Sequence, residues 1–148
     1  MKIVIVGSGA VAINLAYGFA TTTNFQVDIA ARNPQKAKDI ADGLDLKVYI
    51  SSIEKCDTNA DLYIIAVSDR AIEEVYQQLI QHVDQDSCIV HTSGTPSIEV
   101  FGSEARSVGV LYPLQTFTRN RIIDLRDVPF YLEAKDEGHG FRKKANSD

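Results

Sequence analysis

The sequence predicts an α/β protein built on a doubly wound, mostly parallel sheet. Short runs of β-branched residues alternate with helical patterns along the chain, and a glycine-rich turn directly follows the first run. The chain has 148 residues, of which 45% are hydrophobic and 24% are charged, as is typical of one folded domain. We therefore expect one domain over residues 1–134, with about seven strands in one sheet.

The first half of the chain alternates strand and helix in a regular way. We expect strands over residues 2–6, 25–30, 46–50 and 62–67, and helices over residues 10–22 and 34–42. Asn33 followed by Pro34 marks the start of the second helix, because asparagine is favoured as a helix cap and proline at the first helical position.

A third helix and three further strands complete the pattern. Apolar residues recur on one helical face over residues 70–83, and Ser68 or Asp69 is the expected cap. The apolar positions are Ile72, Val75, Tyr76, Leu79 and Ile80. Further along we expect strands over residues 87–91, 107–111 and 128–132, a short helix near residues 97–102, and a flexible charged tail over residues 135–148.

Charge and cysteine content exclude several classes of protein. The 15 basic residues against 20 acidic residues give a net charge of −5, which argues against a general nucleic-acid binder. Cys56 and Cys88 cannot form a disulfide framework, and the chain shows no spacing typical of a metal site. Gly7 and Gly9 interrupt the apolar N-terminal stretch, so we expect neither a signal peptide nor a membrane span. These features favour a cytoplasmic protein without a metal ion.

The glycine-rich turn predicts a dinucleotide site. Residues 7–12 have the pattern G-x-G-x-x-A between a predicted strand and a predicted helix. In this pattern Gly7 permits the tight turn, Gly9 lets a pyrophosphate approach the backbone, and Ala12 lets the helix pack close to the strand. The N–H groups of the helix N-terminus then face the phosphates, and the alternative is a turn that binds nothing. The other cofactor-binding members of the turn are Ser8, Ala10 and Val11.

The residue at the end of the second strand predicts which dinucleotide is preferred. An acidic residue there favours a free ribose 2′-hydroxyl, whereas arginine accommodates a 2′-phosphate. This chain has Arg32 there, followed by Asn33, while Asp28 lies too early, inside the strand. A guanidinium can bind two phosphate oxygens at once, so we expect NADP(H) to be preferred over NAD(H). The alternative is that Arg32 is a solvated surface charge.

Polar residues gather where the later strands end, at the edge of the sheet where such folds bind their ligands. Val67, Ser68 and Asp69 are candidates for contact with the cofactor, although Ser68 and Asp69 equally suit a helix cap. His91 suits proton exchange with a carbonyl or imine during hydride transfer, or it satisfies a local backbone group.

A second group of residues near these strand ends is assigned to the substrate. Ser93 is the second catalytic candidate, although no base is spaced to make it an evident nucleophile. The expected substrate-contacting residues are Thr92, Gly94, Gln115 and Thr116.

Cys88 alternates into the apolar face of its strand, so we expect a core residue and not a reactive thiol.

Four segments together resemble a known family. They are residues 7–12, residues 66–72 (Ala-Val-Ser-Asp-Arg-Ala-Ile), residues 91–95 (His-Thr-Ser-Gly-Thr) and residues 112–117 (Tyr-Pro-Leu-Gln-Thr-Phe). They resemble the Rossmann-like domain of a group of uncharacterised bacterial proteins: NADP oxidoreductases of the deazaflavin-dependent type and pyrroline-5-carboxylate-reductase-like proteins. The resemblance covers roughly residues 1–134 and implies an NADP-binding domain, normally followed by a helical domain that dimerises and closes the substrate site.

Two departures from that family limit what the resemblance implies. No helical domain follows in this sequence, and Tyr112 stands where the family pattern has histidine. The residues themselves do not indicate a deazaflavin site.

We therefore expect a cytoplasmic NADP(H)-binding domain of an oxidoreductase that transfers a hydride to or from a small carbonyl or imine substrate. The expected partners are that small molecule and a second copy in a homodimer, with no nucleic acid and no membrane. The alternative is a non-catalytic nucleotide-binding or sensing module, or a truncated remnant of such an enzyme. We expect the isolated domain to bind its cofactor without much turnover, because its nicotinamide face stays wet.

Overall fold

A seven-stranded sheet forms the centre of the structure, a computed structural model described for residues 1–94, 98–103, 105, 107–118 and 121–135. The strands are β1 (Lys2–Val6), β2 (Gln26–Ala30), β3 (Tyr49–Ser51), β4 (Leu62–Ile65), β5 (Cys88–His91), β6 (Val108–Pro113) and β7 (Phe130–Ala134). Their order across the sheet is β3-β2-β1-β4-β5-β6-β7. Every neighbouring pair is parallel except β6 and β7, which are antiparallel. The predicted doubly wound, mostly parallel sheet is confirmed.

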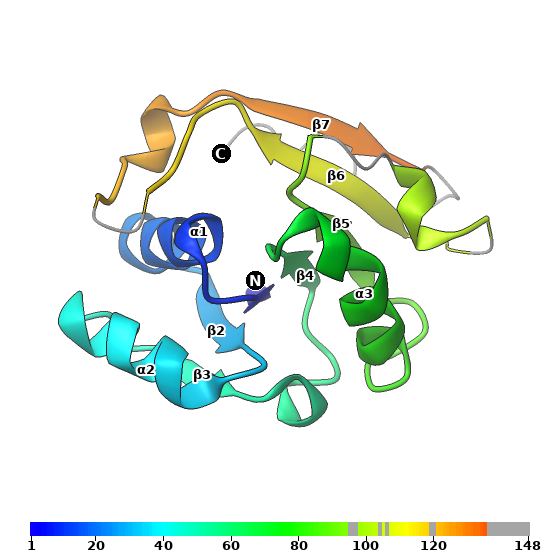
Figure 1. Ribbon diagram of the computed structural model, residues 1–148, viewed down its shortest axis with the longest axis horizontal. Helices are drawn as coiled ribbons and strands as arrows, with labels where there is room; N and C mark the ends of the chain where they lie inside the picture. Colours follow the sequence, from blue (N-terminus) through cyan, green and yellow to red (C-terminus); the bar gives the residue numbers. More distant parts are fainter. Residues whose placement is uncertain (95–97, 104, 106, 119–120, 136–148) are drawn as a thin grey trace.

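Helices cover both faces of the sheet (Figure 1). The α-helices are α1 (Ala10–Thr22), α2 (Pro34–Gly43) and α3 (Ile72–Ile80). The short 3₁₀ helices are η1 (Ile53–Lys55), η2 (Asp69–Ala71), η3 (Ile98–Phe101) and η4 (Leu125–Asp127). α1, α2 and η4 pack on one face, and α3, η1 and η3 pack on the other.

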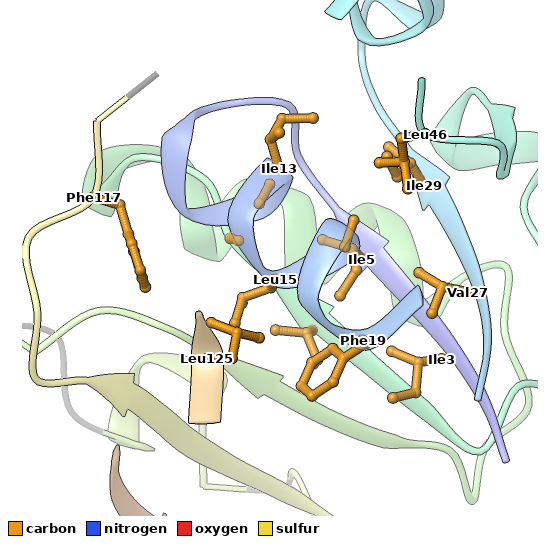
Figure 2. Close-up of a cluster of buried hydrophobic side chains, with 14 of the residues drawn as sticks. Ile3, Ile5, Ile13, Leu15, Phe19, Val27, Ile29, Leu46, Phe117 and Leu125 are labelled. Carbon is orange, nitrogen blue, oxygen red and sulfur yellow. The ribbon is translucent and has the colours of Figure 1, made fainter. Parts of the chain in front are cut away.

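β1 is buried on both faces, which explains its unbroken run of β-branched residues. Ile3 and Ile5 point to the side of α1, whereas Val4 and Val6 point to the side of α3. Figure 2 shows Ile3 and Ile5 beside Phe19 of α1. Because β1 is packed on both faces, the glycine-rich turn that follows it is held in a fixed position.

A buried polar residue of α1 holds the chain between β6 and β7. The Asn14 side chain donates to Ala10 O over 2.9 Å and to Arg121 O over 3.4 Å, and it accepts from Ile123 N over 2.9 Å. Because these bonds satisfy the side chain in the core, the segment around residues 121–128 packs against α1, and Figure 1 shows it beside the helix.

Several predicted boundaries are wrong, for identifiable reasons. The third strand does not begin at Leu46, because the Leu46 N–H still bonds to Ala41 O at the end of α2. The predicted third helix divides into η2 and the shorter α3. After α3, the N–H groups of His82 and Val83 both donate to Leu79 O and close a turn. β6 continues to Pro113 and β7 begins at Phe130, because these two residues pair with each other.

Parts of the C-terminal predictions lie outside the described residues. The predicted short helix is η3, and the residues just before it, 95–97, are not described. The predicted tail is described only at Lys135, whose Nζ donates to Ser103 O and Ala105 O over 2.8 and 2.6 Å. Within the described part of the chain, no helix combines the length and apolar character needed to cross a membrane.

Candidate functional site

A cleft of about 860 Å³ opens at the carboxyl ends of the strands, where β1 and β4 lie side by side. This is the switch point at which open α/β sheets bind their ligands, and the volume suits a small-molecule ligand. The lining residues are Gly7, Ser8, Gly9, Ala10, Val11, Arg32, Asn33, Lys36, Ala66, Val67, Ser68, Asp69, Ala71, Thr92, Ser93, Gly94 and Tyr112. The cleft therefore brings together most of the residues predicted for the site.

Gly7 is required by the geometry of the turn. Its φ of +136° is a conformation that side chains rarely adopt, and an added Cβ would collide with the backbone carbonyl of Ala66. The Gly7 N–H also donates to Ala30 O over 2.8 Å. The turn is thus fixed between the ends of β2 and β4.

Gly9 leaves the N-terminus of α1 open to the cleft. Its φ of −81° is ordinary, and an added Cβ would meet nothing within 4 Å. No side chain caps α1, so the N–H groups of its first turn lack that partner and face the space in front of Gly9. This arrangement fits a pyrophosphate, which helix N-termini bind through backbone N–H groups and the helix dipole. Ala12 does not line the cleft, because it is fully buried beneath the turn.

Two cationic side chains lie on the side of the cleft that follows β2. The side chain of Arg32 is 53% exposed, and its Nη2 lies 3.1 Å from Glu74 Oε1. Asn33 Oδ1 caps α2 by accepting from Lys36 N over 3.2 Å, which places Lys36 at the cleft. The prediction from the sequence did not include Lys36. The available signal was its position three residues after Asn33, the expected cap of the helix.

Asp28 is removed from the cleft by its ion pair with Lys2. The two groups lie 3.2 Å apart, and Asp28 is buried. Burial disfavours the charged form of Lys2, but hydrogen bonds from its ammonium group to Asp57 and Asp28 outweigh this and raise its pKa. Asp28 therefore has a structural role and does not line the cleft, in agreement with its position inside the strand and not at its end.

The loops after β4 and β5 are joined by a hydrogen bond within the cleft. The Ser93 hydroxyl donates to Asp69 Oδ1 over 2.6 Å. Ser68 occupies the cap position of η2, but its side chain makes no capping bond. Asp69 therefore contacts the neighbouring loop, and the expected side-chain cap by either residue is not what the structure shows.

His91 lies beneath the cleft and does not line it. The side chain is fully buried, and its ring packs 5.3 Å from the Phe101 ring, measured between centroids. Its Nδ1 accepts a hydrogen bond from Ser93 N over 3.1 Å. Of the two catalytic candidates, only Ser93 faces the cleft.

Tyr112 separates the cleft from a second hollow. An added Cβ at Gly94 would lie 2.7 Å from Tyr112 Cζ, so glycine lets the tyrosine ring pack against this loop. Gln115 and Thr116 line the neighbouring hollow of about 480 Å³ with Tyr112 and Leu114. Thr92 and Gly94 thus border the cleft, whereas Gln115 and Thr116 lie beyond Tyr112.

Neither cysteine has the environment of a reactive thiol. Burial raises the pKa of Cys56 to about 11, and burial with the nearby Asp61 charge also raises the pKa of Cys88. We predict that Cys56 reacts with a disulfide reagent at pH 8 about 100-fold more slowly in the native Cys88→Ser variant than after unfolding, because little thiolate forms. Thiol titration by absorbance measures both rates. Equal rates would contradict this assignment.

Comparison with known proteins places the chain in a family. The model of the family described as "NADP oxidoreductase, coenzyme F420-dependent" matches residues 2–94. No curated protein matches the chain.

Among solved structures, a candidate NADP oxidoreductase from Bacteroides fragilis is 28% identical, with a TM-score of 0.79. The match covers 92% of this chain and 52% of that protein, so this chain spans about half the length of its structural relative. Prephenate dehydrogenase from Aquifex aeolicus is similar in fold, with 15% identity, a TM-score of 0.74, and coverage of 92% and 53% of the two chains. The family match spans more than half of the sequence, so this chain belongs to the coenzyme F420-dependent NADP oxidoreductase family and contains an NADP-binding, Rossmann-like domain.

Proposed function

We propose that this chain binds NADP(H) in the cleft as the cofactor domain of an oxidoreductase that transfers a hydride to or from a small carbonyl or imine compound. One observation carries the proposal: the open N-terminus of α1 at Gly9 and the cations Arg32 and Lys36 line the same cleft. A dinucleotide with a 2′-phosphate needs both features, one for its pyrophosphate and one for its adenosine end.

We assign the adenosine 2′-phosphate to the two cationic side chains that line the cleft after β2. Arg32 can present two N–H groups to a 2′-phosphate, and Lys36 adds a second positive charge. Asn33 contributes indirectly, because its Oδ1 accepts a hydrogen bond from Lys36 N and so fixes the backbone that carries the Lys36 side chain. The pyrophosphate is assigned to residues 7–12, where Ala12 contributes close packing and no contact.

The nicotinamide side is assigned to the loops after β4 and β5. Bound NADP(H) supplies the hydride, or accepts it. Val67, Ser68 and Asp69 border the nicotinamide ribose in this proposal, and Thr92 and Gly94 border the substrate. We assign Ser93 as the hydrogen-bond donor to a substrate carbonyl or imine. Its single hydroxyl proton, which Asp69 Oδ1 accepts in this structure, turns from Asp69 to the substrate when the substrate binds.

His91 is a positioning residue in this proposal. Its Nδ1 bond to Ser93 N fixes the backbone that carries the donor hydroxyl. Gln115 and Thr116 are assigned to the part of a substrate that extends past Tyr112 into the second hollow.

The family description also names coenzyme F420, and the residues that line the second hollow do not fit it. The hollow beside Tyr112 is lined by Tyr112, Leu114, Gln115 and Thr116. None of them is a cation that could meet the phosphate and carboxylates of that coenzyme. We derive no step through it.

A nucleotide-binding module without turnover is the second candidate function. The burial of His91 favours it, because this histidine does not line the cleft where a ligand would bind. A remnant with an uncovered apolar surface would bind hydrophobic dyes, whereas a complete sensing module would not. Light scattering together with dye fluorescence separates these alternatives.

We also propose a cytoplasmic location and a homodimer. The two cysteines are unpaired, which suits a reducing compartment. Light scattering of the purified chain tests the dimer directly, since a mass of one chain would exclude it.

Replacing Arg32 with alanine tests the adenosine assignment. We expect the dissociation constant for NADPH to rise about 10- to 100-fold, the loss typical of a hydrogen-bonded charge, while that for NADH changes little. Calorimetric titration at fixed ionic strength measures both constants. Arg70→Ala is the matched control, because Arg70 is exposed and does not line the cleft. An unchanged NADPH to NADH ratio in Arg32→Ala would contradict the assignment.

A further inference from the structure

An acidic side chain from α3 reaches the residue assigned to the 2′-phosphate. Glu74 Oε1 lies 3.1 Å from Arg32 Nη2, and the two side chains are 76% and 53% exposed. Ala71 lines the cleft and precedes Glu74 by three residues, a spacing that keeps both on one side of a helix. The ion pair therefore links the two walls of the cleft at its adenosine end, the loop after β2 and the start of α3.

We propose that Glu74 is a specificity-determining residue that competes with the 2′-phosphate of NADP(H) for Arg32 and so narrows the preference for NADP(H) over NAD(H). This inference rests on the proposed function of the cleft. It assigns a role to a carboxylate that comes from α3, far along the chain from the end of β2.

Electrostatics makes Glu74 oppose the binding of NADP(H) but not that of NAD(H). A 2′-phosphate carries between one and two negative charges near neutral pH. To bind Arg32 it must displace Glu74 or lie beside it, and either event costs free energy. A ribose with a free 2′-hydroxyl can enter while the ion pair stays intact, because a carboxylate also accepts hydrogen bonds from hydroxyl groups.

The exchange is feasible because both partners are largely solvated. An exposed ion pair contributes little free energy, so a phosphate can replace the carboxylate without disturbing the fold. Lys36 lines the same cleft and adds a positive charge that attracts the phosphate while Arg32 changes partner.

The test compares Glu74→Gln with Glu73→Gln in the full chain. Glu73 is the adjacent exposed residue of α3, and none of the ion pairs in the described residues includes it, so its variant removes the same charge. We expect Glu74→Gln to bind NADPH about two- to fivefold more tightly, the range typical of an exposed ion pair, with NADH affinity unchanged. Glu73→Gln is expected to leave the NADPH to NADH ratio unchanged.

A double-variant cycle shows whether Glu74 acts through Arg32. In the Arg32→Ala background, Glu74→Gln should no longer change the affinity for NADPH. The gain in the single variant should also shrink as the salt concentration rises, because exposed charges are screened.

The outcomes separate this inference from the proposed function. Equal gains for Glu74→Gln and Glu73→Gln, or a gain that persists in Arg32→Ala, would overturn the role of Glu74 while leaving NADP(H) binding intact. No binding of NADPH by the unmodified chain would overturn both.

Discussion

Replacing Gly9 with alanine is expected to weaken NADPH binding by at least about 100-fold, because a Cβ would stand where the pyrophosphate approaches the N–H groups of α1. The loss of two charge-assisted hydrogen bonds accounts for this magnitude. The fold should not suffer, since φ is −81° and an added Cβ meets nothing within 4 Å. The free energy of unfolding should change by less than about 1 kcal/mol, because the lost freedom of the unfolded chain is opposed by the lower preference for alanine than for glycine at the N-cap of α1.

Two measurements on one sample decide this prediction. Calorimetric titration with NADPH reports the binding, and urea denaturation reports the stability. Undiminished binding in a folded Gly9→Ala variant would mean that the phosphates do not approach the chain at this turn.

Gly7→Ala is expected to damage the fold itself. The substituted residue would need a φ of +136° and would bring its Cβ into the backbone carbonyl of Ala66, which cannot rotate away as a side chain could. We expect a loss of about 2–4 kcal/mol, from backbone strain and overpacking together. That is a large part of the stability of a typical domain, which is about 5–15 kcal/mol.

Urea denaturation, or the yield of soluble protein if the variant is too unstable, measures this loss. The Gly9→Ala variant serves as the matched control, since it makes the same chemical change two residues away. Equal stability of the two variants would contradict the assigned geometry of the turn.

Local sequence patterns predicted the elements that local chemistry decides. Helix α1 was predicted at both of its ends, and Asn33 caps α2 as expected. Elements fixed by distant contacts were less accurate. The ends of β6 and β7 depend on the pairing of Pro113 with Phe130, and neither residue carries a local signal for that partner.

The same distinction explains which site residues the sequence revealed. The rule that ligands bind at the carboxyl ends of parallel strands located the cleft from the ends of the predicted strands. It could not indicate that the His91 side chain turns into the core, because that depends on the packing of Phe101. Lys36 looked like an ordinary solvated residue of a helix, and the contact of Glu74 with Arg32 exists only in the folded chain.

The most direct test of NADP(H) binding is a calorimetric titration of the unmodified chain with NADPH and then with NADH at fixed ionic strength. We predict saturable binding of NADPH that is tighter than that of NADH, together with a higher melting temperature in the presence of NADPH. An absence of both binding heat and thermal stabilisation with either nucleotide would contradict it, and the glycine-rich turn would then be a purely structural feature of this chain.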